Sequence, residues 1–129
     1  MPGTVLIVDD EPGIRSLLVR GLTSAGYRTM EASDGLEAWL LLQHQGVHVD
    51  LVLADVIMPY VTGTELAARI RHDFPHLPVI LLSAYNSTDL VARGLAPSGE
   101  LVTKPFDLQD LVRRIEDVLG RDRPNPPAA

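Results

Sequence analysis

The sequence contains no cysteine in its 129 residues. That absence excludes disulfide bonds, thiolate nucleophiles and zinc sites that depend on cysteine. No apolar run approaches the roughly 20 residues of a membrane-spanning helix, and no signal peptide is visible after Met1. From these absences we expect a cytoplasmic protein that does not insert into a membrane.

Basic residues are also few, because 11 Lys and Arg stand against 17 Asp and Glu and give a formal net charge of −6. A negative chain repels the phosphate backbone of nucleic acids, and no basic patch with interleaved aromatic residues is present. We therefore expect no direct binding of nucleic acid. A hydrophobic content of 46% with 22% charged residues is typical of a globular chain, and the length suits one domain.

Five short strand patterns alternate with helical patterns along the chain. The most apolar runs are residues 4–8, 49–54 and 79–83, whereas residues 27–32 are more polar and residues 101–103 form a short run. The alternation predicts an α/β fold, a doubly wound five-stranded parallel sheet. The three apolar runs should be its central strands, and the flavodoxin-like order 2-1-3-4-5 places them there.

Four helices have a recognisable start, which is Pro12 in the first turn of one helix or a capping residue at Asp34, Thr62 and Asp107. The residues that follow each start at helical spacing form a stripe along one side of that helix. In chain order, these stripes contain Leu18, Leu22 and Ala25; Leu36, Trp39, Leu40 and Gln43; Leu66, Ile70 and Phe74; and Leu108, Leu111, Val112, Ile115, Val118 and Leu119.

Residues 86–99, where a fourth helix would be placed, contain Gly94, Pro97 and Gly99 and no sustained apolar stripe. We predict a helix of about two turns at most, followed by an irregular loop. Residues 120–129 are rich in proline and are not expected to continue the last helix. The predicted organisation is therefore one domain over residues 1–119 and a tail or linker over residues 120–129.

Carboxylates follow two of the central strands. Asp9 and Asp10 come directly after the first strand, and Asp55 ends the third. In a parallel sheet these ends meet at one rim, beside the point where the strand order reverses. Two carboxylates ~4 Å apart repel each other by on the order of 4 kcal/mol at an effective dielectric constant of about 20, so the cluster predicts a bound cation. A small set of oxygen ligands favours Mg²⁺ over Ca²⁺.

Ser83 and Lys104 end the fourth and fifth predicted strands and bring a hydroxyl and an ammonium group to the same rim. Taken separately, the acidic residues could serve as helix and loop caps. Together, an anion site beside a metal site suits in-line transfer of a phosphoryl group to a carboxylate. The five residues favour Asp55 as the acceptor.

The segments around these residues resemble the receiver domain of two-component response regulators, and the resemblance covers residues 4 to about 119. The matching segments are Ile7-Val8-Asp9-Asp10-Glu11, Asp55-Val56-Ile57-Met58-Pro59 with Gly63, Ser83-Ala84 and Lys104-Pro105-Phe106. The resemblance implies that Asp55 receives a phosphoryl group from a sensor histidine kinase or a histidine phosphotransfer protein, which switches partner interactions. A domain of this kind is not an enzyme, although it takes part in its own phosphorylation and dephosphorylation.

The resemblance also implies the role of each residue at the rim. Asp10, Asp55 and the backbone carbonyl of Ile57 are expected to bind Mg²⁺, with Asp9 acting through a water molecule. Two further residues, Ser83 and Lys104, are expected to bind the phosphoryl oxygens, and the peptide bond between Lys104 and Pro105 is expected to be cis.

The sequence departs from the family pattern at Leu101, because receivers usually carry an aromatic residue three positions before the lysine. Tyr85 or Phe106 could replace that aromatic residue, although either could also have only a structural role. A small partner-binding patch is predicted from residues on the first helix and beside the rim, which are Ile14, Leu17, Tyr85 and Pro105. The alternative is that Ile14 and Leu17 only widen the core face of their helix.

Two other functions fit parts of the sequence. A magnesium phosphatase of the haloacid dehalogenase type would carry Asp-x-Asp after its first strand, whereas this chain has adjacent Asp9 and Asp10, and it would need room for a cap domain. A degenerate receiver could act only as a binding module, but it would not need all five residues. The proline-rich tail and the short fourth helix favour a receiver of a hybrid kinase over a free-standing regulator. The four histidines, His44, His48, His72 and His76, are expected on the surface.

Overall fold

The computed structural model describes residues 3–44, 48–95, 97 and 100–122, in which strands and helices alternate. The strands are β1 (Thr4–Val8), β2 (Arg28–Ala32), β3 (Leu51–Asp55), β4 (Val79–Ser83) and β5 (Glu100–Thr103). The helices are α1 (Pro12–Ser24), α2 (Gly35–Gln43), α3 (Gly63–Asp73), α4 (Ser87–Ala92) and α5 (Leu108–Asp122). Within the described ranges, no helix has the length and apolar character needed to cross a membrane.

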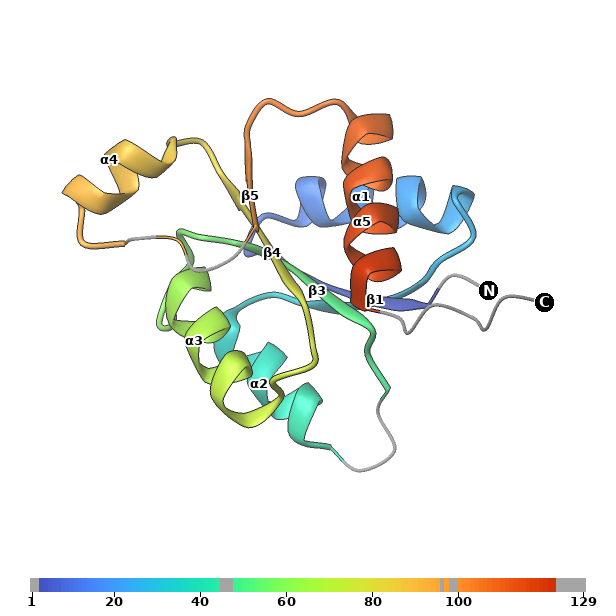
Figure 1. The fold of residues 1–129 in the computed structure, drawn as a ribbon, viewed down its shortest axis with the longest axis horizontal. Helices are drawn as coiled ribbons and strands as arrows, with labels where there is room; N and C mark the ends of the chain where they lie inside the picture. Colours follow the sequence, from blue (N-terminus) through green and yellow to red (C-terminus); the bar gives the residue numbers. More distant parts are fainter. Residues whose placement is uncertain (1–2, 45–47, 96, 98–99, 123–129) are drawn as a thin grey trace.

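The five strands form one parallel sheet in the order β2-β1-β3-β4-β5, which confirms the predicted topology. The apolar strands β1, β3 and β4 lie in the centre, and the more polar β2 and the short β5 form the edges. Helices α1 and α5 cover one face, while α2 and α3 cover the other (Figure 1). The strand order reverses between β1 and β3, so their carboxyl ends border the predicted site.

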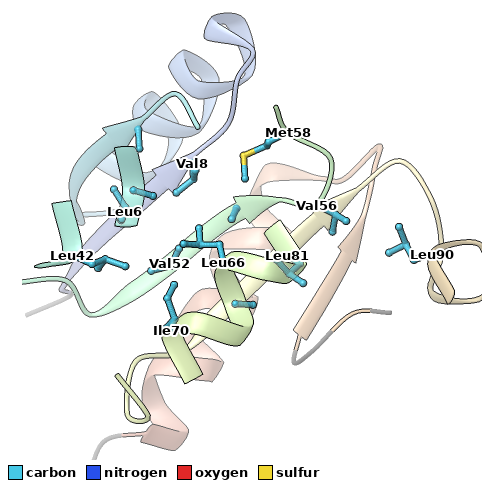
Figure 2. Close-up of a cluster of buried hydrophobic side chains, with 14 residues drawn as sticks. Leu6, Val8, Leu42, Val52, Val56, Met58, Leu66, Ile70, Leu81 and Leu90 are labelled. Carbon is cyan, nitrogen blue, oxygen red and sulfur yellow. The ribbon is translucent and has the colours of Figure 1, made fainter. Parts of the chain in front are cut away.

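Side chains of the central strands alternate between two buried clusters, as the two-residue period of a strand requires. Leu6 and Val8 of β1 belong to the α2–α3 cluster, which Figure 2 shows and which also contains residues of α2, α3 and α4. Val5 and Ile7 belong to the α1–α5 cluster on the opposite face. Because both faces are covered, the central strands are apolar throughout, which explains their uninterrupted hydrophobic runs.

Helix α2 buries a different side from the stripe that the sequence suggests. Its buried residues are Gly35, Ala38 and Leu42, whereas Leu36 and Leu40 are 50% and 60% exposed. Between residues 36 and 42 only Glu37 is polar, so hydrophobic spacing alone cannot select the inward face of this helix. Trp39 and Gln43 also belong to the predicted stripe, and Gln43 is exposed. Trp39 is half-buried and packs edge-on against Phe74, with 5.9 Å between the ring centroids.

The ends of α1 and α5 also differ from the predictions. Ala25 is exposed because it is the C-cap of α1 and not part of its core stripe. Helix α5 continues through Gly120 to Asp122, three residues beyond the predicted end at Leu119. A glycine costs a helix only about 1 kcal/mol, and the next proline is Pro124, which restricts the residue before it. The predicted tail over residues 123–129 lies outside the described residues.

Helix α4 has six residues and confirms the prediction of a short fourth helix. Asn86 caps its start by accepting a hydrogen bond from the backbone N–H of Asp89 at 2.9 Å. Gly94 follows the helix in the left-handed region at φ 74°, where a side chain is unfavourable. The next residue, Leu95, donates its N–H to the carbonyl of Leu90 at 2.7 Å. The glycine therefore ends the helix, as its position in the sequence predicts.

Candidate functional site

The carboxyl ends of four strands bring the five predicted residues to one rim of the sheet. Asp9 follows β1, Asp55 ends β3, Ser83 ends β4 and Lys104 follows β5. One carboxylate oxygen from each of Asp9, Asp10 and Asp55 lies within 4.8 Å of the other two. The parallel sheet therefore gathers charges that are up to 95 positions apart in the chain.

Lys104 faces the carboxylates. Its Nζ donates a hydrogen bond to Asp55 Oδ2 at 3.0 Å and lies 3.9 Å from Asp9 Oδ2. The second distance is too long for a hydrogen bond. Lys104 is therefore hydrogen-bonded to Asp55 and interacts with Asp9 only through longer-range electrostatic attraction. One ammonium group cannot offset three carboxylates, which leaves excess negative charge at the rim.

Asp9 is the most deeply buried of the carboxylates, with 1% of its surface exposed. Its Oδ1 accepts a 2.9 Å hydrogen bond from the backbone N–H of Glu11, while its Oδ2 has no hydrogen-bond partner among the described residues. Burial raises the pKa of Asp9 above its ordinary value of 3.8, and the charges of Asp55 and Asp10 raise it further against the opposing effects of the Glu11 N–H and Lys104.

The donor set fits a hard cation such as Mg²⁺. Three carboxylates offer oxygen ligands, and one buried oxygen at Asp9 lacks a partner. A divalent cation at this position would offset the repulsion within the cluster. Ile57, whose backbone carbonyl is predicted to bind Mg²⁺ together with Asp10 and Asp55, lies in the loop after Asp55 and is 45% exposed.

The loop after Asp55 is fixed by backbone hydrogen bonds and by close packing against α3. Val56 donates its N–H to Leu82 at 2.9 Å, and Gly63 donates its N–H to Val56 at 2.7 Å. A Cβ atom added at Gly63 would lie closer than 3.0 Å to the backbone carbonyl of Asp55. Glycine is therefore required at this position, because the start of α3 packs directly against the backbone of the predicted acceptor.

Ser83 and Lys104 are linked by their backbones. Ser83 is 1% exposed, and its Oγ accepts a hydrogen bond from the backbone N–H of Tyr85 at 2.9 Å. Lys104 donates its backbone N–H to the Ser83 carbonyl at 2.7 Å, which extends the pairing of β4 with β5. The peptide bond between Lys104 and Pro105 is cis, as predicted.

Arg15 is a residue of the rim that the sequence does not reveal. Its Nη1 donates a 2.7 Å hydrogen bond to the backbone carbonyl of Asp9, and its Nε pairs with Glu31 of β2 at 3.3 Å. Arg15 therefore fixes the backbone that carries the two adjacent carboxylates. An arginine in the first turns of a helix looks like any surface arginine in a single sequence, so no signal distinguishes it.

The four residues of the predicted partner patch do not pack as one group. Ile14 is half-buried against the α1–α5 cluster, whereas Tyr85 is half-buried against the α2–α3 cluster on the other face of the sheet. Leu17 is 47% exposed, and Pro105 is exposed in the loop before α5. The side chains of the four histidines are exposed, and none belongs to the acidic cluster.

The arrangement combines a carboxylate nucleophile with groups that can bind an anion. Asp55 is paired with an ammonium group, a hydroxyl lies at the end of the adjacent strand, and the acidic cluster can hold a cation. Positive charge beside the nucleophile can offset the charge of a phosphoryl group, which otherwise repels a carboxylate. The geometry is thus suited to phosphoryl transfer onto Asp55.

Comparisons with known proteins agree with this geometry. Residues 5–116 match the response regulator receiver domain family. The chain is 40% identical over 124 residues to the response regulator GtcR of Aneurinibacillus migulanus, covering 94% of this chain and 49% of that protein. It is 36% identical over 120 residues to the sensor kinase CckA of Brucella abortus, covering 92% of this chain and 13% of that protein.

Solved structures agree as well. The response regulator TrrA of Thermotoga maritima, in a complex with Mg²⁺ and BeF, shares 35% identity and has a TM-score of 0.76, covering 92% of this chain and 99% of that chain. The chain spans about half or less of the length of the two curated relatives. Because the family match extends over most of its length, the chain belongs to the family of response regulator receiver domains.

Proposed function

We propose that Asp55 accepts a phosphoryl group from the phosphohistidine of a sensor histidine kinase or histidine phosphotransfer protein. One observation carries the proposal: Lys104 Nζ lies 3.0 Å from Asp55 Oδ2 within a cluster of three carboxylates. This arrangement neutralises part of the acceptor's charge and leaves the remaining negative charge available to a cation. Membership of the receiver family supports the same role.

In the transfer, an Asp55 carboxylate oxygen forms a bond to phosphorus while the phosphorus–nitrogen bond of the donor breaks. The electron pair of that bond stays on the imidazole of the donor histidine. Lys104 and Ser83 would then bind oxygens of the transferred group, since the ammonium and hydroxyl groups are the donors at this rim. Hydrolysis is the later attack of water on the same phosphorus, which returns the Asp55 carboxylate and releases phosphate.

The residues that would hold Mg²⁺ are Asp10, Asp55 and the Ile57 carbonyl, with Asp9 acting through a water molecule. When bound, Mg²⁺ supplies positive charge for the oxygens of the transferred phosphoryl group. The buried Asp9 oxygen without a partner supports this assignment, as does the Mg²⁺-BeF complex of the related protein TrrA.

Kinase contact belongs to the same proposal. Ile14, Leu17, Tyr85 and Pro105 are the predicted contacts of the phosphodonor protein. Charge substitutions at Ile14 and Leu17 should slow phosphotransfer from a protein donor and leave phosphorylation by a small donor unchanged. A cytoplasmic location and a role without direct nucleic-acid binding are part of this proposal as well. The relationship to the sensor kinase CckA supports a receiver of the hybrid-kinase type.

Incubation with acetyl phosphate and Mg²⁺, followed by intact mass measurement, tests the proposal. The parent protein should gain one phosphoryl group, and Asp55→Asn should gain none, because an amide is a poor nucleophile. Asp73→Asn is a matched control, since Asp73 lies at the other end of α3 and pairs with His72. This control variant should be phosphorylated like the parent.

The same samples distinguish the two other functions. A phosphatase would release phosphate from an added phosphomonoester over many turnovers. A pure binding module would show neither turnover nor mass gain. Equal phosphorylation of the parent and Asp55→Asn would contradict the assignment of the acceptor.

A further inference from the structure

Arg15 of α1 holds the peptide unit that joins the two adjacent carboxylates. Its Nη1 donates the 2.7 Å hydrogen bond to the backbone carbonyl of Asp9. That carbonyl belongs to the peptide unit between Asp9 and Asp10, whose atoms lie close to one plane from the first Cα to the second. A donor that fixes the carbonyl oxygen therefore constrains the orientation of the backbone from which both carboxylate side chains project.

The other hydrogen bonds of Asp9 act on the opposite side of this residue. Its backbone N–H donates to the carbonyl of Ala32 in β2 at 3.2 Å, and its Oδ1 accepts from the N–H of Glu11 at 2.9 Å. The contact with Arg15 acts on the carbonyl side, which leads to Asp10. Asp10 is exposed, so side-chain packing does little to place it. The position of its carboxylate depends more strongly on the backbone that carries it.

The guanidinium of Arg15 is itself fixed. The side chain is only 19% exposed, and its Nε pairs with Glu31 Oε1 at 3.3 Å. Glu31 lies in β2 opposite Ile7 of β1. Because the guanidinium is planar, its Nε and Nη1 donors keep a fixed angle to each other. The contact with β2 therefore sets the direction from which Nη1 reaches the carbonyl of Asp9.

We propose that Arg15 increases the affinity of the rim for Mg²⁺ by positioning Asp9 and Asp10. This inference rests on the proposed function, in which Asp10 binds the ion directly and Asp9 acts through a water molecule. Groups that orient metal ligands without touching the metal commonly change its affinity by roughly 10- to 100-fold. Arg15 is a positioning residue in this sense, since it touches the backbone of Asp9 and not the ion.

The charge of Arg15 acts in the opposite direction from its hydrogen bond. A cation close to the acidic cluster repels a second cation, so loss of the Arg15 charge alone should strengthen the binding of Mg²⁺. Loss of the positioning contact should weaken it. The sign of the change in affinity therefore distinguishes the two effects.

Urea denaturation in EDTA and at increasing Mg²⁺ concentrations tests the proposal. The increase in the free energy of unfolding with Mg²⁺ gives the dissociation constant of the ion for each variant. Arg15→Met keeps an aliphatic side chain and removes both donors. It should raise the dissociation constant by about tenfold or more, the lower end of the usual effect. The samples in EDTA report separately how much Arg15 contributes to the fold, and a merely structural role would change only that value.

Two further variants complete the comparison. Arg15→Lys keeps the charge, but the lysine Nζ takes the place of the arginine Cζ and falls short of the Nη1 position. This variant should also raise the dissociation constant, by less than Arg15→Met does. Arg20→Met is the matched control, since Arg20 is an exposed arginine of the same helix, and it should bind Mg²⁺ like the parent.

The outcomes separate this proposal from the one on which it rests. A dissociation constant of Arg15→Met equal to or lower than that of the parent overturns the positioning role and leaves the assignment of Mg²⁺ to the acidic cluster intact. If Arg15→Met does not fold, the same result for Arg15→Lys overturns it. A parent protein that Mg²⁺ does not stabilise overturns both this inference and the metal assignment.

Discussion

The rim of the sheet and helix α4 differ in how firmly the chain holds them. At the rim, Asp9 and Ser83 are almost completely buried, and backbone hydrogen bonds fix the loop after Asp55. Helix α4, which follows β4 in the chain, has only six residues and one fully buried side chain. Segments with few buried contacts open at lower free energy than the core of a domain. A firmly held chemical site therefore lies beside a short helix that should open more readily.

Gly63→Ala should have the largest effect and would test the rigidity of the rim. The added methyl group would meet the Asp55 backbone, which β3 holds in place. We expect the free energy of unfolding in urea to fall by about 3 kcal/mol, the upper part of the usual range for overpacking. Gly13→Ala in α1 has no atom within 4 Å of the added group and should be neutral or slightly stabilising. Similar losses in both variants would contradict the close-packing argument.

Mg²⁺ should stabilise the rim by mass action. At a concentration of about 100 times its dissociation constant, the ion should raise the free energy of unfolding by about 2.7 kcal/mol. Asp9→Asn and Asp10→Asn should reduce this gain, which denaturation with Mg²⁺ and with EDTA measures. Asp73→Asn lies away from the cluster and should keep the full gain. If all three variants kept the full Mg²⁺-dependent increase in the free energy of unfolding, the ion would not bind at the acidic cluster.

Because the pKa of Asp9 is raised, the free energy of unfolding should depend on pH when EDTA keeps metal ions away from the rim. Between the ordinary value of 3.8 and the raised value, the folded state binds more protons at Asp9 than the unfolded state does. The contribution of Asp9 to stability is therefore present below this window and is lost as the pH rises through it. Relative to the parent, Asp9→Asn should lose less stability over the window. A parallel pH profile for the two proteins would contradict the shift.

Gly94→Ala should have a smaller effect, which arises from the backbone alone. Gly94 has open space around it but lies at φ 74°, where a side chain costs about 1–2 kcal/mol. Gly94→Asn should recover part of this loss, because asparagine tolerates the left-handed region. Gly63→Asn should recover nothing, since space and not φ limits that position. Urea denaturation of the four variants measures their free energies of unfolding. Equal losses of stability in Gly94→Asn and Gly63→Asn would contradict the claim that φ limits one position and space the other.

Arg93→Ala should have the smallest effect on stability, about 0.5–1 kcal/mol, as expected for an exposed cation–π pair. Urea denaturation of this variant measures the loss at the end of α4, where the Arg93 Cζ lies 4.0 Å from the centroid of the Tyr85 ring. A loss of several kcal/mol in urea would show instead that Arg93 supports the fold.

The sequence predicts that the three carboxylates, Ser83 and Lys104 lie together, because each is at the end of a strand or within two residues of it. Buried parallel strands have a strong hydrophobic signal, and their order places Asp9, Asp55 and Lys104 together. The short α4 is likewise predictable, since Gly94 and Pro97 interrupt the helical pattern. These features depend on local signals and on one rule of topology.

Other features depend on contacts that a single sequence does not contain. The buried side of α2 cannot be chosen from spacing when both Leu40 and Leu42 are apolar. The bond from Arg15 to the Asp9 carbonyl and the contact of Arg93 with Tyr85 join residues through space. Tyr60 is a further example, because its φ of 70° and its exposed ring are not indicated by its neighbours.

The charge of the acidic cluster also bears on how quickly a phosphodonor arrives. Three carboxylates and the Lys104 ammonium leave a formal charge of −2 at the rim. An anionic donor approaching the metal-free rim is repelled before it makes contact, and added salt should speed its association by screening that field. A bound divalent cation cancels the formal charge, so the association rate should then depend little on ionic strength. The cluster therefore makes access to the acceptor, as well as the chemistry, depend on the metal.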